Sequence, residues 1–375
     1  MDATLAHIRL KRRDLILFLR ELVECESPSD NPASIARAND LIATWSGDIA
    51  KARRVRNHLV LEFKTPGKKR TDGQVMGLGH TDTVWPLGTL KTMPWREGEG
   101  RLWGPGVLDM KAGLTFFLFA ARSLVERDIP TPRKIVLVIN ADEEVGSADS
   151  RALTEAEAKK SAAVLVLEPG TGLEGEAKTA RKGIGDYSIT VKGVAAHAGV
   201  DFEKGANAIV ELARQVERVS ALTDLRKGTT VSPGVIQGGT RRNVIPAEAS
   251  VQLDLRVTSL AQAKRVERQL RALKAIDRRC KIEIAGGLNR PPMERSPGVV
   301  RLYKLARKLA AEMGVTLDES ATGGGSDGNF TAALGVPTLD GIGAVGEGAH
   351  AKHESILIDR IDDRTALLAK LLAAV

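Results

Sequence analysis

The chain has 375 residues, of which 43% are hydrophobic and 27% are charged, values typical of a globular protein and not of a disordered one. Its net charge of +8 does not indicate nucleic-acid binding, because Lys and Arg are scattered apart from short clusters such as residues 51–56, without interleaved aromatic residues. No apolar stretch suits a signal peptide or a membrane span, and the two cysteines do not suggest a disulfide framework, so we expect a cytoplasmic protein.

Helices and strands alternate over the first half of the chain. The apolar periodicity predicts helices over residues 10–25, 33–47 and 111–126. Runs of mostly apolar residues predict strands over residues 58–63, 74–79, 134–140 and 162–168. This alternation predicts an α/β fold with a mostly parallel sheet that helices cover on both faces.

The pattern changes after Arg181. Strands are predicted over residues 185–193, 229–239, 245–257 and 280–287, and helices over residues 206–219 and 259–273. Their β-α-β-β-α-β order is that of a ferredoxin-like α+β unit. Helix and strand alternation then resumes near Ser296 and ends in a helix over 363–375. We therefore expect a catalytic domain made of residues 1–180 and 292–375, with an inserted domain over 181–291.

Several acidic and imidazole side chains follow strand-like runs or lie in glycine-rich loops. They are His80, Asp82, Asp109, Glu143, Glu144, Glu168 and His350. Because the carboxyl ends of parallel strands meet at one edge of a sheet, we expect these side chains to converge. Taken alone, each motif has an ordinary explanation as a solvated turn or helix start. Together they suit a pair of zinc ions that share one carboxylate, which indicates a di-metal hydrolase.

The wording and order of these motifs resemble one family over practically the whole chain. The matching blocks are GHTDTVWP, GPGVLDMKAG, NADEEVGS, LEPG, VKGVAAHAG, GGTRRNVIPAEA, TGGGSDGNF and AHAKHES. They resemble the zinc-dependent family of acetylornithine deacetylase, succinyl-diaminopimelate desuccinylase, the aminoacylases and bacterial glutamate carboxypeptidase. The blocks are specific for this family and much less specific for a substrate.

The resemblance implies a role for each residue of the metal site. Two zinc ions, with cobalt or manganese as alternatives, would be held by His80, Asp109, Glu144, Glu168 and His350, with Asp109 bridging both. Asp82 would orient the His80 imidazole, and Glu143 would act as general base. His353 is an alternative to His350, which the resemblance favours because it stands four residues before Glu354.

The resemblance also implies residues that contact the substrate. His197 of one subunit would stabilise the oxyanion in the active site of the other, which implies a homodimer, and Asn243 would lie near the substrate carbonyl. Arg290 and the loop with Gly324 and Gly325 would bind the substrate carboxylate. The ordinary alternatives are a loop histidine, a solvated hinge arginine and a plain glycine turn.

The expected activity is hydrolysis of a small-molecule or short-peptide amide that releases a C-terminal glutamate or a similar amino acid. One alternative is an N-acyl-amino-acid deacylase of the acetylornithine deacetylase or aminoacylase type, which shares every metal ligand. An alternative of another class is a non-catalytic homologue that only binds such a compound. The inserted domain is expected to serve as a lid and as the dimerisation domain.

Overall fold

The computed structural model describes residues 2–67 and 71–375, which form two compact units. The first unit comprises the chain through Ala180 together with Arg295–Thr322 and Ser326–Val375. The second comprises Arg181–Glu294 and Gly323–Gly325. The helices in the described ranges are too short or too polar to span a membrane.

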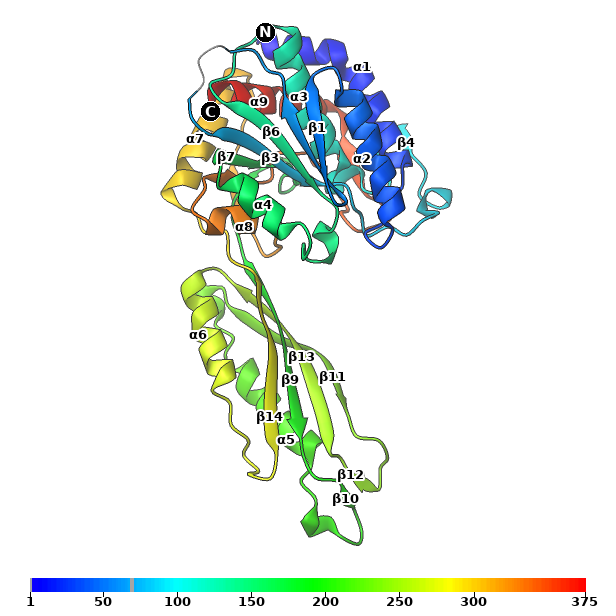
Figure 1. The fold of residues 1–375 in the computed structure, drawn as a ribbon, viewed down its shortest axis with the longest axis vertical. Helices are drawn as coiled ribbons and strands as arrows, with labels where there is room; N and C mark the ends of the chain where they lie inside the picture. The colour runs from blue at the N-terminus through cyan, green and yellow to red at the C-terminus, as the bar shows by residue number, and fades with distance from the viewer. Residues whose placement is uncertain (1, 68–70) are drawn as a thin grey trace. The chain divides into compact units, whose positions relative to one another are not determined.

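A six-stranded sheet forms the centre of the first unit (Figure 1). In spatial order its strands are β1 (Ala50–Val55), β2 (His58–Phe63), β6 (Lys134–Asn140), β3 (Gln74–His80), β7 (Ser161–Val166) and β16 (Thr338–Leu339). The pairs β6–β3, β3–β7 and β7–β16 are parallel, whereas β2 runs antiparallel to both of its neighbours. The prediction of a mostly parallel sheet is confirmed.

Helices cover both faces of this sheet. Those whose side chains enter the main core are α1 (Ala3–Glu24), α2 (Pro32–Ser46), α3 (Ala112–Glu126), α7 (Pro297–Glu312) and α9 (Ile361–Ala374). The second face packs against α4 (Arg151–Ala158), which contacts the short helix α8 (Gly328–Ala333). Every residue of β3 is buried, as expected for a strand with a layer on each side.

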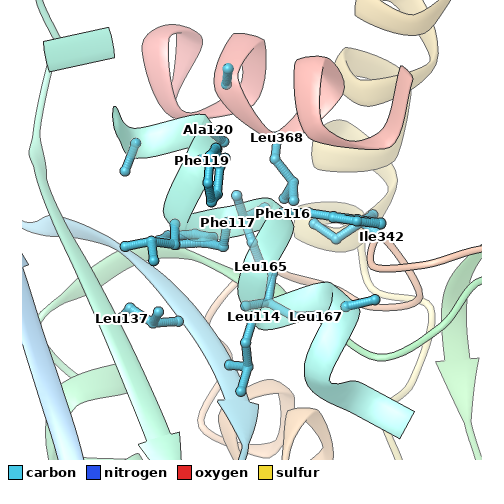
Figure 2. Close-up of a cluster of buried hydrophobic side chains, with 14 of the residues drawn as sticks. Leu114, Phe116, Phe117, Phe119, Ala120, Leu137, Leu165, Leu167, Ile342 and Leu368 are labelled. Carbon is cyan, nitrogen blue, oxygen red and sulfur yellow. The ribbon is translucent and has the colours of Figure 1, made fainter. Parts of the chain in front are cut away.

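Helix α3 packs closely on β3 because two positions of that strand are glycines. A Cβ atom on Gly77 would lie 2.5 Å from the Phe117 ring, and one on Gly79 would lie 2.8 Å from Leu114. Figure 2 shows Leu114 and Phe117 of α3 among the buried apolar side chains. Glycines in a strand often mark such a close approach of a neighbouring element.

The second unit contains an antiparallel sheet and two helices in β-α-β-β-α-β order (Figure 1). Its elements are β9 (Gly183–Lys192), α5 (Ala208–Ser220), β11 (Thr230–Gly238), β13 (Glu248–Val257), α6 (Leu260–Arg271) and β14 (Lys281–Arg290). The strands lie in the order β11-β13-β9-β14, and buried residues alternate along β9 and β13. The ferredoxin-like pattern predicted from the sequence is confirmed.

One strand was not predicted from the sequence. Most of the basic cluster of residues 51–56 lies in β1, at an edge of the large sheet, with its basic side chains exposed. Positively charged side chains on an edge strand hinder pairing with a second molecule, which explains a basic sequence in a strand. The sequence pattern did not predict this strand because its exposed residues are mostly basic, so that no apolar run marks it.

Candidate metal centre

Three of the candidate ligands stand at the carboxyl edge of the large sheet. His80 is the last residue of β3, and it pairs with Asn140 at the end of the neighbouring β6. The short 3-10 turn Glu143–Val145 follows β6, and Glu168 follows β7. Because β6, β3 and β7 are parallel neighbours, these residues emerge at the same edge.

Two further candidate ligands come from loops that a small sheet holds together. Asp109 lies in the turn Val107–Lys111 before α3, and His350 lies between β17 (Gly346–Glu347) and β18 (Ser355–Leu357). Strand β18 pairs with β5 (Arg101–Trp103), which brings the two loops together. His350 has a φ of 62°, a conformation uncommon outside glycine that is often found at functional sites.

The five predicted ligands form two groups that share Asp109. One group is His80, Asp109 and Glu168, the other is Asp109, Glu144 and His350, and in each the ligand atoms lie within 4.8 Å of one another. The distances to Nε2 of His80 are 3.3 Å from Asp109 Oδ1 and 3.6 Å from Glu168 Oε1. Nε2 of His350 lies 3.4 Å from the other Asp109 oxygen and 3.2 Å from Glu144. Each carboxylate oxygen of Asp109 therefore faces a different histidine.

The polar atoms at the centre of this arrangement fit a bound cation. His80 Nε2 and Asp109 Oδ1 are buried, and neither makes a hydrogen bond to any described residue. Buried polar atoms without partners are rare, and a cation between these two would satisfy both. Zinc, cobalt and manganese all accept imidazole nitrogens and carboxylate oxygens as ligands.

The carboxylates around both histidines favour the protonated imidazole before an ion binds. The Asp109 and Glu144 carboxylates raise the pKa of His350 to about 10. Burial favours the neutral form of His80, but the contacts with Asp109, Asp82 and Glu168 outweigh it and raise the pKa well above its usual value. A metal ion binds only the neutral imidazole, so binding must displace these protons.

We therefore expect loading of both ions at pH 7 to release about two protons per subunit. The metal affinity should rise with pH up to about pH 10, the pKa of His350, and the raised pKa of His80 acts in the same direction. Calorimetry in buffers of different ionisation enthalpy measures the proton count directly. The variant His350→Ala should release about one proton fewer, whereas release of none by the wild type would contradict the pKa directions.

Asp82 connects His80 with the two neighbouring glutamates. Its Oδ1 lies 3.4 Å from His80 Nδ1, and its side chain is fully buried. The same carboxylate accepts the backbone N–H of Glu143 and of Glu144, each at 3.2 Å, and the hydroxyl of Ser29 at 2.8 Å. Asp82 thus positions the turn that carries both glutamates in addition to contacting the imidazole that it was predicted to orient.

Glu143 stands beside Glu144 but belongs to neither group of ligands in the described chain. The turn that presents it is anchored at its far end, where the Ser147 hydroxyl donates to the buried carboxylate of Asp327. Asn140 donates to the same carboxylate from the end of β6. Glu144 thus belongs to a candidate ligand group, whereas its neighbour Glu143 does not and is held by its backbone N–H.

Glu354 contributes to the site although its sequence motif predicted no role for it beyond its spacing from His350. Its buried carboxylate accepts the backbone N–H groups of Gly106, Leu108 and Asp109 at 2.9–3.0 Å and the indole N–H of Trp85 at 2.9 Å. Burial raises the pKa of this carboxyl, and the four donors oppose the rise. In the sequence Glu354 is simply an acidic residue directly before β18, and no local pattern there indicates that its side chain is buried.

Replacing Glu354 with glutamine should weaken metal binding about 10- to 100-fold, the usual cost of losing a residue that orients a ligand. The amide offers one acceptor oxygen instead of two, so N–H groups of the Asp109 turn lose their partner. Competition with a chelator measures the affinity. The matched control is Glu347→Gln, since Glu347 is an exposed residue of the adjacent β17 that pairs with Arg101. Equal affinities in the two variants would contradict this role.

The second unit brings two of the predicted substrate-contacting residues together. His197 lies in β10 (Ala196–His197), which pairs with β12 (Val244–Ile245), and the Ala198 N–H donates to the carbonyl of Asn243. Both His197 and Asn243 are exposed. The Gly199 N–H donates to His197 Nδ1, which leaves Nε2 to carry the proton of the neutral ring and to act as a donor.

Arg290 and the glycine loop are neighbours in the second unit. Arg290 ends β14 and is only 4% exposed, so it is a buried residue and not a solvated hinge arginine. A Cβ atom on Gly325 would lie 2.9 Å from Arg290 Cδ. Arg181 donates to the carbonyls of Gly324 and Gly325, which ties the loop to this unit. The loop is therefore anchored through its carbonyl groups.

Comparison with known proteins links this arrangement to one family. The model of peptidase family M20/M25/M40 matches residues 77–374. Carboxypeptidase G2 of Pseudomonas sp. strain RS-16 is 29% identical, and the alignment covers 96% of this chain and 92% of the relative. A succinyl-diaminopimelate desuccinylase of Cereibacter sphaeroides is also 29% identical, and that alignment covers 96% of this chain and 98% of the relative. The crystal structure of a dinuclear metal-binding M20 peptidase from Bacillus subtilis superposes with a TM-score of 0.73 at 15% identity, covering 98% of each chain.

Proposed function

The chain belongs to peptidase family M20/M25/M40, and from this premise we propose that it is a di-zinc hydrolase that releases a C-terminal glutamate or similar amino acid from an acyl or peptidyl group. The observation that carries the metal assignment is Asp109, whose two carboxylate oxygens each face a different histidine. Similarity to carboxypeptidase G2 along nearly the full length supports the choice of reaction. Membership in a peptidase family favours catalysis over a role restricted to binding.

The mechanism divides the work between residues that hold the ions and residues that move protons. His80 and Glu168 would hold one ion, Glu144 and His350 would hold the other, and Asp109 would serve both groups. When bound, the ions would supply Lewis-acid chemistry, namely polarisation of the amide carbonyl and a lower pKa for water at the site. Glu143 takes a proton from the attacking water and donates it to the departing nitrogen. Asp82 holds Glu143 in place through its backbone N–H.

His197 and Asn243 are proposed to stabilise the oxyanion that forms at the substrate carbonyl. We propose that this His197 comes from a second subunit of a homodimer. In support, the second unit exposes apolar side chains that one copy alone leaves in water, among them Val200, Phe202, Val235 and Ile236. Two of these lie on β11, an edge strand of its sheet that can pair with another copy.

Mixing two inactive variants tests this arrangement. His197→Ala and Glu143→Gln subunits, unfolded and refolded together, should recover about a quarter of the wild-type activity. Half of randomly mixed dimers contain both kinds of subunit, and each of these has one site with an intact Glu143 and an intact partner histidine. Light scattering checks that dimers form. Recovery of no activity from mixed dimers would place His197 in its own subunit's site instead.

The amino acid that leaves is proposed to be held by Arg290 and by the backbone of Gly324 and Gly325. An arginine binds a carboxylate through two parallel hydrogen bonds, which selects a substrate with a free terminal carboxylate. The competing assignment, an N-acyl-amino-acid deacylase, uses the same metal site and is supported by the similarity to succinyl-diaminopimelate desuccinylase.

The deciding experiment measures amine release by the zinc-loaded protein from an aromatic N-acylglutamate and from N-acetylornithine. Faster release of glutamate supports the carboxypeptidase assignment, and Arg290→Lys should then raise KM for the acylglutamate. Faster deacetylation of N-acetylornithine would retain the metal chemistry and move the protein to the deacylases.

A further inference from the structure

His58 is a buried histidine that has no role in the mechanism described so far. It is the first residue of β2 and is only 1% exposed. Strand β2 runs antiparallel to β6, with Leu59 opposite Ile139, so the beginning of β2 lies beside the carboxyl end of β6. The turn that carries Glu143 and Glu144 leaves the sheet at that end. The imidazole of His58 therefore lies at the base of this turn.

Both ring nitrogens of His58 face a partner. The backbone N–H of Ala141 donates to Nδ1 at 3.1 Å, and Nε2 lies 3.1 Å from Oδ2 of Asp149. Because Nδ1 accepts a hydrogen bond, the neutral ring carries its proton on Nε2 and donates it to the Asp149 carboxylate. His58 is thus an acceptor toward one end of the segment 141–149 and a donor toward the other.

The neutral ring that this arrangement needs is favoured by burial. Burial lowers the pKa of His58 and the nearby Arg56 adds to this effect, and together they outweigh the carboxylates that oppose it, which are those of Asp142, Asp327 and Asp82. A protonated ring would have no acceptor nitrogen, and the backbone N–H at the base of the turn would lose its partner.

The segment 141–149 is otherwise closed largely on itself. The Asp142 carboxylate accepts the backbone N–H of Asp149 at 2.7 Å, and the Asp142 carbonyl accepts that of Ser147 at 2.8 Å. These bonds fix the shape of the segment but do not attach it to β2. His58 makes that attachment, because its ring contacts both Ala141 and Asp149 from the neighbouring strand.

We propose that His58 is a positioning residue for the reaction, which fixes the segment that carries Glu143 and Glu144 relative to β2. Asp149 acts through His58, because it accepts the Nε2 proton and so keeps Nδ1 available to Ala141. This inference rests on the proposed function, in which Glu143 transfers the proton. A general base must stay within hydrogen-bond reach of the water, and a displacement of about 1 Å can lower the rate about 100-fold.

The first test does not depend on activity. Hydrogen exchange of the metal-free protein, followed by mass spectrometry, reports how often residues 141–149 open. His58→Phe keeps a ring but removes both hydrogen bonds, so these residues should exchange about fivefold faster. His58→Asn offers an amide oxygen near the position of Nδ1 and should exchange at nearly the wild-type rate.

The matched control for this test is His7→Phe. His7 lies in α1, where its Nε2 is 3.3 Å from Glu126, so the variant makes the same change at another histidine that faces a carboxylate. His7→Phe should leave exchange of residues 141–149 unchanged. Equal exchange of this segment in His58→Phe and in the wild type would overturn the inference.

The second test is kinetic and uses excess zinc so that both metal sites are filled. His58→Phe should lower kcat about 10- to 100-fold at nearly unchanged KM, because the base is displaced while substrate binding is retained. His58→Asn should stay within about threefold of the wild type. A loss that appears only in KM, or equal losses of kcat in the Phe and Asn variants, would overturn the inference.

Asp149→Ala tests the same link with the imidazole left in place, and therefore applies even if His58→Phe does not fold. It should lower kcat about threefold, and it should have no further effect when combined with His58→Phe, since Asp149 acts through that ring. A wild-type kcat in Asp149→Ala, or a full additional loss in the double variant, would overturn the inference.

The two tests together distinguish this inference from the proposed function. If His58→Phe accelerates exchange of residues 141–149 while the wild type releases no glutamate, the proposed function fails and the attachment of the segment by His58 stands. If the wild type releases glutamate and Glu143→Gln does not, yet neither exchange nor kcat changes in His58→Phe, the proposed function stands and the role of His58 is overturned.

Discussion

Replacing Glu143 with glutamine is expected to lower kcat by about 10²- to 10⁴-fold while two metal ions per subunit remain bound. Glutamine keeps the size of the side chain and the backbone N–H that donates to Asp82, but it cannot accept a proton from water. Glu143 belongs to neither ligand group, so the metal content should not change. The measurement pairs steady-state kinetics with elemental analysis of the same preparation.

The neighbouring residue provides the control for this result. Glu144→Gln changes the same chemical group one position later, but it removes a proposed ligand that lies 3.2 Å from His350. This variant should lose one of its two ions, and excess zinc should restore part of its activity. If Glu143→Gln lost metal and Glu144→Gln kept it, the two roles would have to be exchanged.

Replacing Asp109 with alanine should remove both ions and lower activity by about a thousandfold, since metal-assisted charge stabilisation is worth several kcal/mol. Asp109 is the only described residue common to the two ligand groups. By contrast, Glu168→Ala and Glu144→Ala each disturb one group and should each leave one ion bound. Metal stoichiometry after dialysis against trace zinc compares the three variants.

Thermal unfolding with and without zinc separates loss of metal from loss of fold. Zinc at about a thousand times its Kd should stabilise the wild type by about 4 kcal/mol per site, because the ion binds only the folded protein. Asp109→Ala should show no such stabilisation, yet without zinc it should unfold cooperatively. An undiminished zinc-dependent shift in Asp109→Ala would show that this carboxylate is not shared between the ions.

The architecture was predictable because its signals are local. A parallel strand buried on both sides must be apolar along its length, as β3 and β6 are, and a half-buried strand must alternate, as β9 does. Strand β1 escaped prediction because its exposed positions are basic. Ligand candidates were predictable for a related reason, since polar residues that directly follow such strands emerge at the carboxyl edge of the sheet.

The sequence by itself therefore determined the fold class, the order of the elements and the residue types available to a metal pair. Only the tertiary structure decided that Asp109 lies between two histidines, that Glu354 receives four N–H donors, and that Arg290 is buried. The physical reason is distance along the chain. Glu354 and its Asp109 partner are 245 positions apart, and such contacts depend on how whole elements pack, which no local pattern of residues records.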